Sequence, residues 1–353
     1  MSEKYIGLDV HQATISVAVM DSTGRVVMES ILETKAATIL EFLAGLRGTL
    51  VVTFEEGTWA AWLYDLLTPR VAKLVVCNPR KAALLKDGNK SDRIDARKLA
   101  DLLRLNNLKP VYHGETGVRM LRELARSYLT LVKDLTRVMN RLKASYRSWA
   151  IPCAGRDVYY TRHRAEWLSK IPEAGVRRRA ERLYQQMDML QYLRQEARRE
   201  LLAESRKHLI PAKLRQIPCF GPIRSALAVA LIQRPHRFRT KRQLWAYSGL
   251  ALETRTSGEY RYVDGQLQRS KKQISIRGLN KDHNHDLKGL FQGAATRASV
   301  QPGPFQDFYQ RSLAKGIKPT MARLTLARKI AAITLTLWKK GENFDAEKLT
   351  SQA

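Results

Sequence analysis

Two aspartates, Asp92 and Asp95, stand three residues apart in a segment that reads as one helix over residues 91–104. Residues three apart lie on the same face of a helix, one turn from each other. Two carboxylates this close repel, but carboxylate oxygens are the ligands that Mg²⁺ prefers in proteins. Acids in a first turn also favour the helix dipole and pair with Arg93 and Arg97, so this structural interpretation stands beside the metal-binding one.

Two further acids lie far upstream, each at the end of an apolar run. Asp9 ends the run that begins at Tyr5, and Glu55 follows the run that begins at Leu50, with Glu56 as a rival for its role. Strand ends are the usual edge for sites in α/β sheets, although either acid alone is also a common strand-end residue. If they converge with Asp92 and Asp95, four carboxylates hold two divalent ions, Mg²⁺ or Mn²⁺, as phosphoryl transfer requires.

A hydroxyl nucleophile has a candidate in Ser257, which precedes Gly258 in a polar loop. Ser-Gly pairs are most often only turns, and Tyr260 and Tyr262 are rival hydroxyls nearby. Basic residues surround this loop or lie on the polar face of a long helix. They either contact nucleic acid or form a surface that only solvent contacts. They are Arg255, Arg261, Lys271, Lys272, Arg137 and Arg141.

The elements that position these residues follow from hydrophobic periodicity. A strand hairpin and then strands alternating with helices predict an N-terminal α/β sheet with helices on its faces. The helix over residues 91–104 has Ser91 as its N-cap. Long amphipathic helices over residues 116–148 and 177–207 predict an antiparallel coiled coil or helical hairpin. The remainder of the chain is mostly helical, and its last long helix covers residues 322–338.

Charge and composition favour a polyanionic partner. The 353 residues carry a formal charge of +29, while residues 1–60 hold only four Lys/Arg against eight Asp/Glu. An acidic N-terminal segment in a strongly basic chain indicates a metal-binding region beside a nucleic-acid grip. Three widely spaced cysteines make no zinc or disulfide pattern. No signal peptide and no membrane-spanning run stand out, so we expect a reducing cytoplasm and no membrane partner.

The order of motifs along the chain resembles the DEDD insertion-sequence transposases. These are Piv-like, bridge-RNA-guided recombinases of the one-ten family of insertion sequences. The segments that carry the resemblance are YIGLDV, FEEGTW, NPRKA, KSDRIDARKLA, IPCFGPIRSALAVALI and LWAYSGLALETRTSG. Within them, Pro218–Gly221 reads PCFG where the family usually has PGxG.

The resemblance implies a three-part chain: a RuvC-like ribonuclease H fold over residues 1–112, a coiled coil over 113–210 and a C-terminal transposase domain over 211–353. It also implies a metal tetrad of Asp9, Glu55, Asp92 and Asp95, and it places the serine nucleophile at Ser257.

The same resemblance implies a transposase that cuts and rejoins DNA through a phosphoserine link. Its partners are element-end and target DNA, a structured non-coding RNA and further copies of the chain, as a dimer or tetramer. The expected setting is a bacterial or archaeal cytoplasm, on the nucleoid. The alternative is a RuvC-like nuclease or junction resolvase that uses the same acids with water as its nucleophile.

Overall fold

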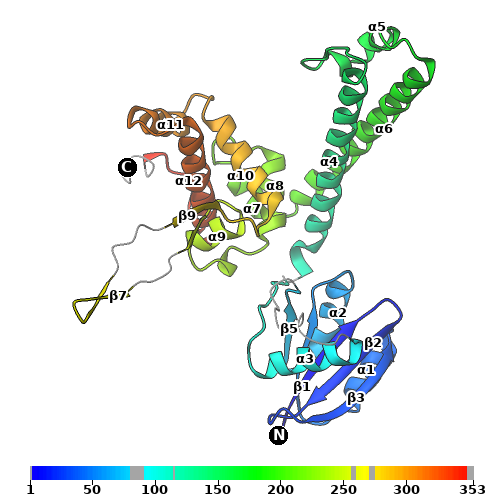
Figure 1. The fold of residues 1–353 in the computed structure, drawn as a ribbon, viewed down its shortest axis with the longest axis vertical. Helices are drawn as coiled ribbons and strands as arrows, with labels where there is room; N and C mark the ends of the chain where they lie inside the picture. The colour runs from blue at the N-terminus through cyan, green and yellow to red at the C-terminus, as the bar shows by residue number, and fades with distance from the viewer. Residues whose placement is uncertain (1, 80–90, 114–115, 256–259, 270–274, 348–353) are drawn as a thin grey trace. The chain divides into compact units, whose positions relative to one another are not determined.

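A computed structural model describes residues 2–79, 91–113, 116–255, 260–269 and 275–347. The chain forms two compact units, Met1–His113 and Gly114–Ala353 (Figure 1). Ser257, Lys271 and Lys272 lie outside the described residues.

The first unit is a mixed five-stranded sheet with strand order β3-β2-β1-β4-β5. Neighbours β1, β2 and β3 are antiparallel, whereas β4 runs parallel to β1 and β5 runs parallel to β4. The strands are β1 (Glu3–Val10), β2 (Thr14–Met20), β3 (Val26–Glu33), β4 (Thr49–Glu55) and β5 (Lys73–Cys77). The predicted hairpin and the predicted α/β class are both confirmed.

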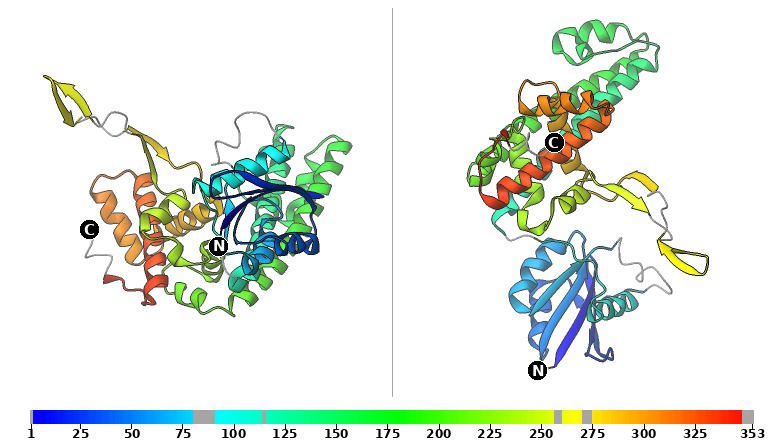
Figure 2. Two further views of the ribbon diagram at one scale, coloured as in Figure 1. Left: turned by 90° about the horizontal axis from the view of Figure 1, so that it is seen from below. Right: turned by 90° about the vertical axis from the view of Figure 1, so that its left-hand side faces the viewer.

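Helices cover both faces of this sheet (Figure 2). Helices α1 (Ala36–Ala44) and α2 (Ala60–Leu67) bury one face, where Ile6, Leu8 and Phe54 form the core. Helix α3 (Asp92–Arg104) packs on the opposite face, the one that Gly7 presents. Side chains alternate between faces along a strand, so the odd-numbered residues of β1 are those directed at α3.

The second unit is mostly helical. Helices α4 (Arg119–Arg147) and α6 (Ala174–Ser205) pack along each other as an antiparallel hairpin. Leu142 near the end of α4 and Leu183 near the start of α6 belong to one hydrophobic core. Leu121 near the start of α4 and Leu201 near the end of α6 belong to another. The predicted helical hairpin is therefore confirmed, while its supercoiling into a coiled coil stays a prediction.

The second unit has seven further helices among the described residues: α5 packs against the α4–α6 hairpin, and the others share the core that holds Leu121 and Leu201. The seven are α5 (Arg164–Ser169), α7 (Leu209–Leu214), α8 (Pro222–Ile232), α9 (Lys241–Tyr247), α10 (His285–Ala298), α11 (Pro304–Ala314) and α12 (Pro319–Lys340). Two small antiparallel sheets pair β6 (Leu252–Arg255) with β9 (Ser275–Leu279), and β7 (Tyr260–Val263) with β8 (Gln266–Arg269). Across the described residues, every helix is too short or too polar to span a bilayer.

Candidate metal centre

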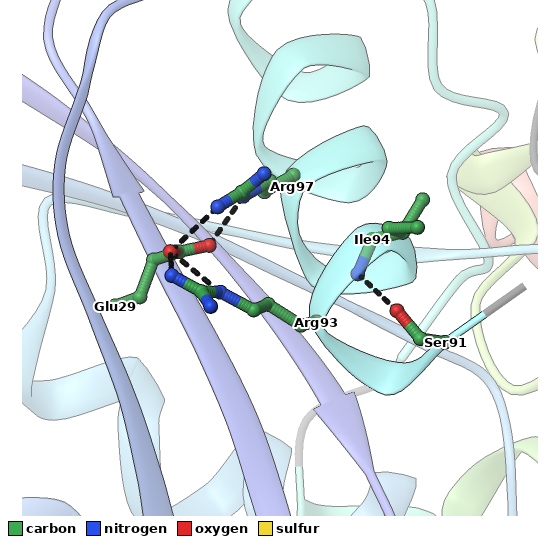
Figure 3. Close-up of polar contacts among 5 residues, drawn as sticks. All are labelled: Glu29, Ser91, Arg93, Ile94 and Arg97. Carbon is green, nitrogen blue, oxygen red and sulfur yellow. Dashed lines mark hydrogen bonds and ion pairs between the residues drawn. The ribbon is translucent and has the colours of Figure 1, made fainter.

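Helix α3 begins where the sequence predicts. The Ser91 hydroxyl accepts a hydrogen bond from the Ile94 N–H at 3.3 Å, and Ser91 itself has extended backbone angles (Figure 3). Asp92 and Asp95 occupy the first turn, where the partial positive charge of the helix N-terminus favours carboxylates. The local sequence thus sets both the start of the helix and the position of its two acids.

Gly7 lets α3 lie directly on β1. A Cβ added at Gly7 would be 2.2 Å from the carbonyl oxygen of Ala96 and 2.6 Å from the backbone nitrogen of Ala100. Ala96 and Ala100 are themselves fully buried, so the contact is one of small residues on both sides. Asp92 precedes Ala96 by one helical turn and so continues this contact row toward the carboxyl end of β1.

An ionic clamp, made by Glu29 with Arg93 and Arg97, ties α3 to β3. The Glu29 carboxylate on β3 accepts hydrogen bonds from the guanidinium groups of both Arg93 and Arg97 (Figure 3). These bonds, with Arg97 contributing most, lower the pKa of Glu29 to about 2. Arg93 and Arg97 therefore pair with β3 rather than with Asp92 and Asp95, which leaves the structural interpretation of the aspartates without its expected partners.

Strand register brings Asp9 and Glu55 to one face. Gly7 pairs with Thr53 and Leu8 with Phe54 in the parallel ladder, so Asp9 and Glu55 stand one step further on, side by side. Both lie on the Gly7 face because side chains alternate with a period of two.

Glu56 points away from this face. Its carboxylate lies 2.6 Å from the Nε2 atom of His113, and the His113 ring stacks on Tyr64 of α2 at 4.8 Å. A step of one residue reverses the side of the sheet, so Glu55 rather than Glu56 joins the acids of α3.

The acids interact with each other and with a histidine. His11 Nε2 lies 3.1 Å from an Asp9 oxygen and 3.6 Å from an Asp92 oxygen. The ligand atoms of Asp9, His11 and Asp92 all lie within 4.8 Å of one another, a candidate metal-binding group. Sequence reasoning did not include His11. The signal available was its position two residues after a strand-end acid, in the turn that returns to β2.

Burial and mutual repulsion perturb two of the acids. Burial raises the pKa of Asp9, with Asp92 and Asp95 raising it further and His11 opposing them. Burial likewise raises the pKa of Glu55, followed by the charges of Asp9 and Asp95. Asp9 and Glu55 therefore lie within electrostatic reach of the acids of α3, and this proximity disfavours the ionised form of both strand-end carboxyls.

The donor set suits a divalent cation. Among the described residues, the buried Oδ1 atom of Asp95 has no hydrogen-bond partner, and the Lys98 ammonium lies 4.0 Å from it as an ion pair, so this oxygen keeps lone pairs for a cation. Carboxylate oxygens with an imidazole nitrogen match hard or borderline divalent ions. Cys77 neighbours Glu55 in the ladder, but burial raises the pKa of its thiol to about 12, so it stays protonated at neutral pH.

The other predicted residues lie in the second unit. Arg137 and Arg141 are exposed on α4, and Arg137 also donates to Asp134 at 2.6 Å. Arg255 ends β6 and Arg261 lies in β7. Ser257, Lys271 and Lys272 lie outside the described residues. The nucleophile role of Ser257 and the nucleic-acid role of the six basic residues both stay predictions.

The acids of the first unit gather at strand ends against a helix that carries a DxxD motif. A transposase family model of that type matches residues 6–147, which include all four acids, and the model of the transposase IS116/IS110/IS902 family matches residues 212–310. The chain belongs to the IS110-type DEDD transposases of insertion sequences.

A curated relative agrees with this assignment. The insertion element IS116 uncharacterized 44.8 kDa protein of Streptomyces clavuligerus is 28% identical over 116 residues. This match covers 33% of the present chain and 26% of the relative, so it spans about a quarter of that protein's length.

Proposed function

We propose that this chain cuts and rejoins DNA strands at the ends of an insertion sequence, with a divalent-metal acidic tetrad and a serine nucleophile. The observation that carries the proposal is the meeting of Asp9, Glu55, Asp92 and Asp95 on one face of the sheet, from three elements distant in sequence. Membership of a transposase family supplies DNA as the substrate class.

The tetrad holds Mg²⁺ or Mn²⁺, and His11 is placed to add a nitrogen ligand or to orient Asp9. A bound divalent ion supplies positive charge that stabilises the attacking and leaving oxygens in phosphoryl transfer. The protein's own contribution is to keep four carboxylates together against their repulsion, through the Gly7 contact and the Glu29 clamp. Because the pKa values of Asp9 and Glu55 are raised, protons compete with the cation as the pH falls.

Ser257 is the proposed nucleophile. Its Oγ forms a bond to the scissile phosphorus while one phosphorus–oxygen bond of the DNA strand breaks. The serine proton is lost and the leaving strand oxygen gains a proton, so charge and atoms balance without a redox step. Rejoining is the reverse reaction with the hydroxyl of another strand. The position of Ser257 within the second family match, residues 212–310, supports this role.

The large positive charge supports further nucleic-acid partners. A charge of +29 suits backbone contacts to both DNA and a structured non-coding RNA that reads sequence by base pairing. Association of several copies, a RuvC-like fold for the first unit and a three-domain division belong to the same proposal. The mixed sheet with α3 on one face is consistent with that fold.

The test is covalent capture of the reaction intermediate. Purified protein is incubated with element-end DNA, Mg²⁺ and RNA transcribed from the element's flanks, then denatured and resolved for a protein–DNA adduct. We expect an adduct with wild type, its absence with Ser257→Ala and with Asp92→Asn, and its retention with Glu56→Gln but not Glu55→Gln. Glu56→Gln is the matched control, since it makes the same chemical change one residue away on the opposite face of the sheet.

Two results would replace the proposal. Cleaved DNA without an adduct, unaffected by Ser257→Ala but lost in Asp92→Asn, selects a nuclease that uses water. An adduct that persists in Glu55→Gln and disappears in Glu56→Gln would contradict the face assignment of the tetrad.

A further inference from the structure

The chain turns back at the end of α4, before it reaches α5 (Figure 1). Beyond this turn, the Lys143 ammonium donates to the Gly155 carbonyl oxygen at 2.6 Å, and the Tyr159 hydroxyl donates to the Met139 carbonyl oxygen at 3.3 Å. These two bonds hold residues 155–159 against the last turns of α4. Side chains from the helix and from the returning segment therefore share one surface of the hairpin.

The reversal is a fixed part of the fold. Ala150 has a left-handed backbone, φ 56°, and the Ile151 N–H donates to the Tyr146 carbonyl oxygen at 3.1 Å. Cys153 and Val158 are buried in the hydrophobic core that also holds Tyr146. A left-handed backbone is costly for a residue other than glycine, so the surrounding contacts must hold it in place. A surface built on such a turn is preorganised, which lowers the entropy lost when a ligand binds.

Three cations converge on this surface. Arg147 lies one turn beyond Lys143 on α4. Arg156 directly follows the carbonyl group that Lys143 binds. The Lys143 ammonium is 5.2 Å from the centroid of the Tyr159 ring. Burial raises the pKa of the Tyr159 hydroxyl, and the charges of Arg147 and Arg156 oppose that shift, so both guanidinium groups also lie near this phenol.

The two arginines have no acidic partner among the described residues. Arg147 and Arg156 are exposed, and neither side chain forms a hydrogen bond or a salt bridge there. Asp157, the adjacent acid in sequence, is exposed and forms no salt bridge with them. The negative end of the helix dipole accounts for a cation in the last turn of α4, but not for Arg156 in the returning segment. Like charges that converge repel each other, so an anion bound between them is favoured.

An exposed indole follows these cations in the turn. Trp149 is two residues beyond Arg147, and 39% of its surface is exposed. Its backbone N–H donates to the Tyr146 carbonyl oxygen at 3.0 Å, which holds the residue in the reversal. Within the part of the chain that the structure describes, the Trp149 ring has no aromatic or cation–π contact. Both its position and its open ring face therefore suit stacking with a planar ligand.

We propose that the turn surface, formed by Arg147, Trp149 and Arg156, binds an unpaired segment of a nucleic-acid strand, with phosphates at the arginines and one base on the indole. A guanidinium donates two parallel hydrogen bonds to a phosphate, and every base has a ring face for stacking. Bases within a duplex are stacked on each other, so an open indole favours an unpaired segment. That the anion is a nucleic acid rests on the proposed function. The turn surface shares no residue with the tetrad or with Ser257.

Equilibrium binding in EDTA tests this inference apart from strand cleavage. Full-length protein is titrated into short labelled single strands, DNA in one arm and RNA of matching sequence in the other, and fluorescence anisotropy gives the affinity. Each strand is also made with abasic positions, and the titrations are repeated over a range of salt concentrations. The variants are Arg147→Gln, Arg156→Gln, Trp149→Ala and Trp149→Phe.

Arg198→Gln is the charge-matched control. Arg198 is exposed on α6 and, like the two arginines of the turn, has no salt bridge among the described residues. It lies about 21 Å along the helix axis from Tyr184. The Tyr184 hydroxyl bonds that of Tyr146 near the end of α4, so Arg198 is remote from the turn surface.

We expect Arg147→Gln and Arg156→Gln each to weaken binding to intact and abasic strands alike. Each makes the plot of log affinity against log salt shallower by about 0.7, the value for one phosphate contact to a single strand, whereas Arg198→Gln leaves the slope unchanged. Trp149→Ala weakens binding to intact strands by about 5- to 100-fold and leaves abasic binding unchanged. Trp149→Phe keeps most of the affinity, which separates loss of stacking from a folding defect. The arm with the higher affinity identifies the strand as DNA or RNA.

Three results would overturn the proposal. Equal losses of affinity and slope in Arg156→Gln and Arg198→Gln would mean that bulk charge explains binding. Unchanged affinity in Trp149→Ala, or the same loss on intact and abasic strands, would remove the stacked base. A wild type that binds neither strand would contradict the surface itself. Adduct formation at Ser257 is measured separately: an adduct without these binding effects refutes the turn surface alone, and these binding effects without an adduct refute the serine chemistry alone.

Discussion

Replacing Gly7 by alanine tests whether close packing of α3 on β1 positions the tetrad. The new Cβ would meet backbone atoms of Ala96 and Ala100, which cannot rotate away as a side chain would. The 2.2 Å separation must open to at least 3.0 Å, so the helix moves by about 1 Å, a displacement that costs about 100-fold in rate when it falls on catalytic groups. Overpacking of this kind costs about 1–3 kcal/mol of stability.

Two measurements separate the effects. Denaturant unfolding of the purified variant gives the stability change, and the rate of Mg²⁺-dependent adduct formation gives the activity change under conditions where the variant is folded. The matched control is Gly45→Ala in the same unit, where the backbone is helical and the nearest contact of a new Cβ is 3.5 Å. A Gly7→Ala variant as stable and as active as Gly45→Ala would refute the claim that this contact sets the position of Asp92 and Asp95.

Three further predictions follow from charge and backbone geometry. In EDTA at neutral pH, Asp9→Asn raises the thermal unfolding midpoint, because a carboxylate whose pKa is raised by burial destabilises the folded chain once it ionises. Mg²⁺ at one hundred times its dissociation constant stabilises the wild type by about 2.7 kcal/mol and stabilises Asp9→Asn by less. If Mg²⁺ stabilised both proteins equally, Asp9 would not be a metal ligand. At neutral pH the wild type is more stable than Glu29→Gln. This stability difference is lost as the pH falls from the ordinary glutamate value of 4.5 toward 2, because the pKa of Glu29 is about 2 in the folded chain. A stability difference that is the same at neutral pH and at pH 2 contradicts the clamp. Cys219 has a left-handed backbone, φ 68°, where the family usually has glycine, so Cys219→Gly is more stable than Cys219→Ala by about 1 kcal/mol in denaturant unfolding.

The acidic site illustrates how far local sequence reaches. Ser91, the first-turn aspartates and the apolar period of α3 act within one helix, so the cap and the face of Asp92 and Asp95 were predictable from spacing alone. Asp9 and Glu55 were predictable as strand-end acids because an apolar run that stops at a carboxylate is itself a local signal. The two long helices followed in the same way from their apolar stripes.

Relations between elements needed the tertiary structure. His11 joins the acids only because β1, its turn and α3 meet in space, and the choice of Glu55 over Glu56 depends on which face of the sheet α3 covers. The pairing of Glu29 with Arg93 and Arg97 links residues more than sixty positions apart, which no helical period reports.

The sequence by itself therefore determined which elements form, which residues end them, and which chemistry those residues offer. Only the fold decided which of these residues meet, which buried donors and acceptors keep no partner, and where a glycine is required by a neighbouring helix. The physical reason is that propensity, capping and periodicity are set within a few residues, whereas strand register and helix docking depend on burying distant surfaces against each other.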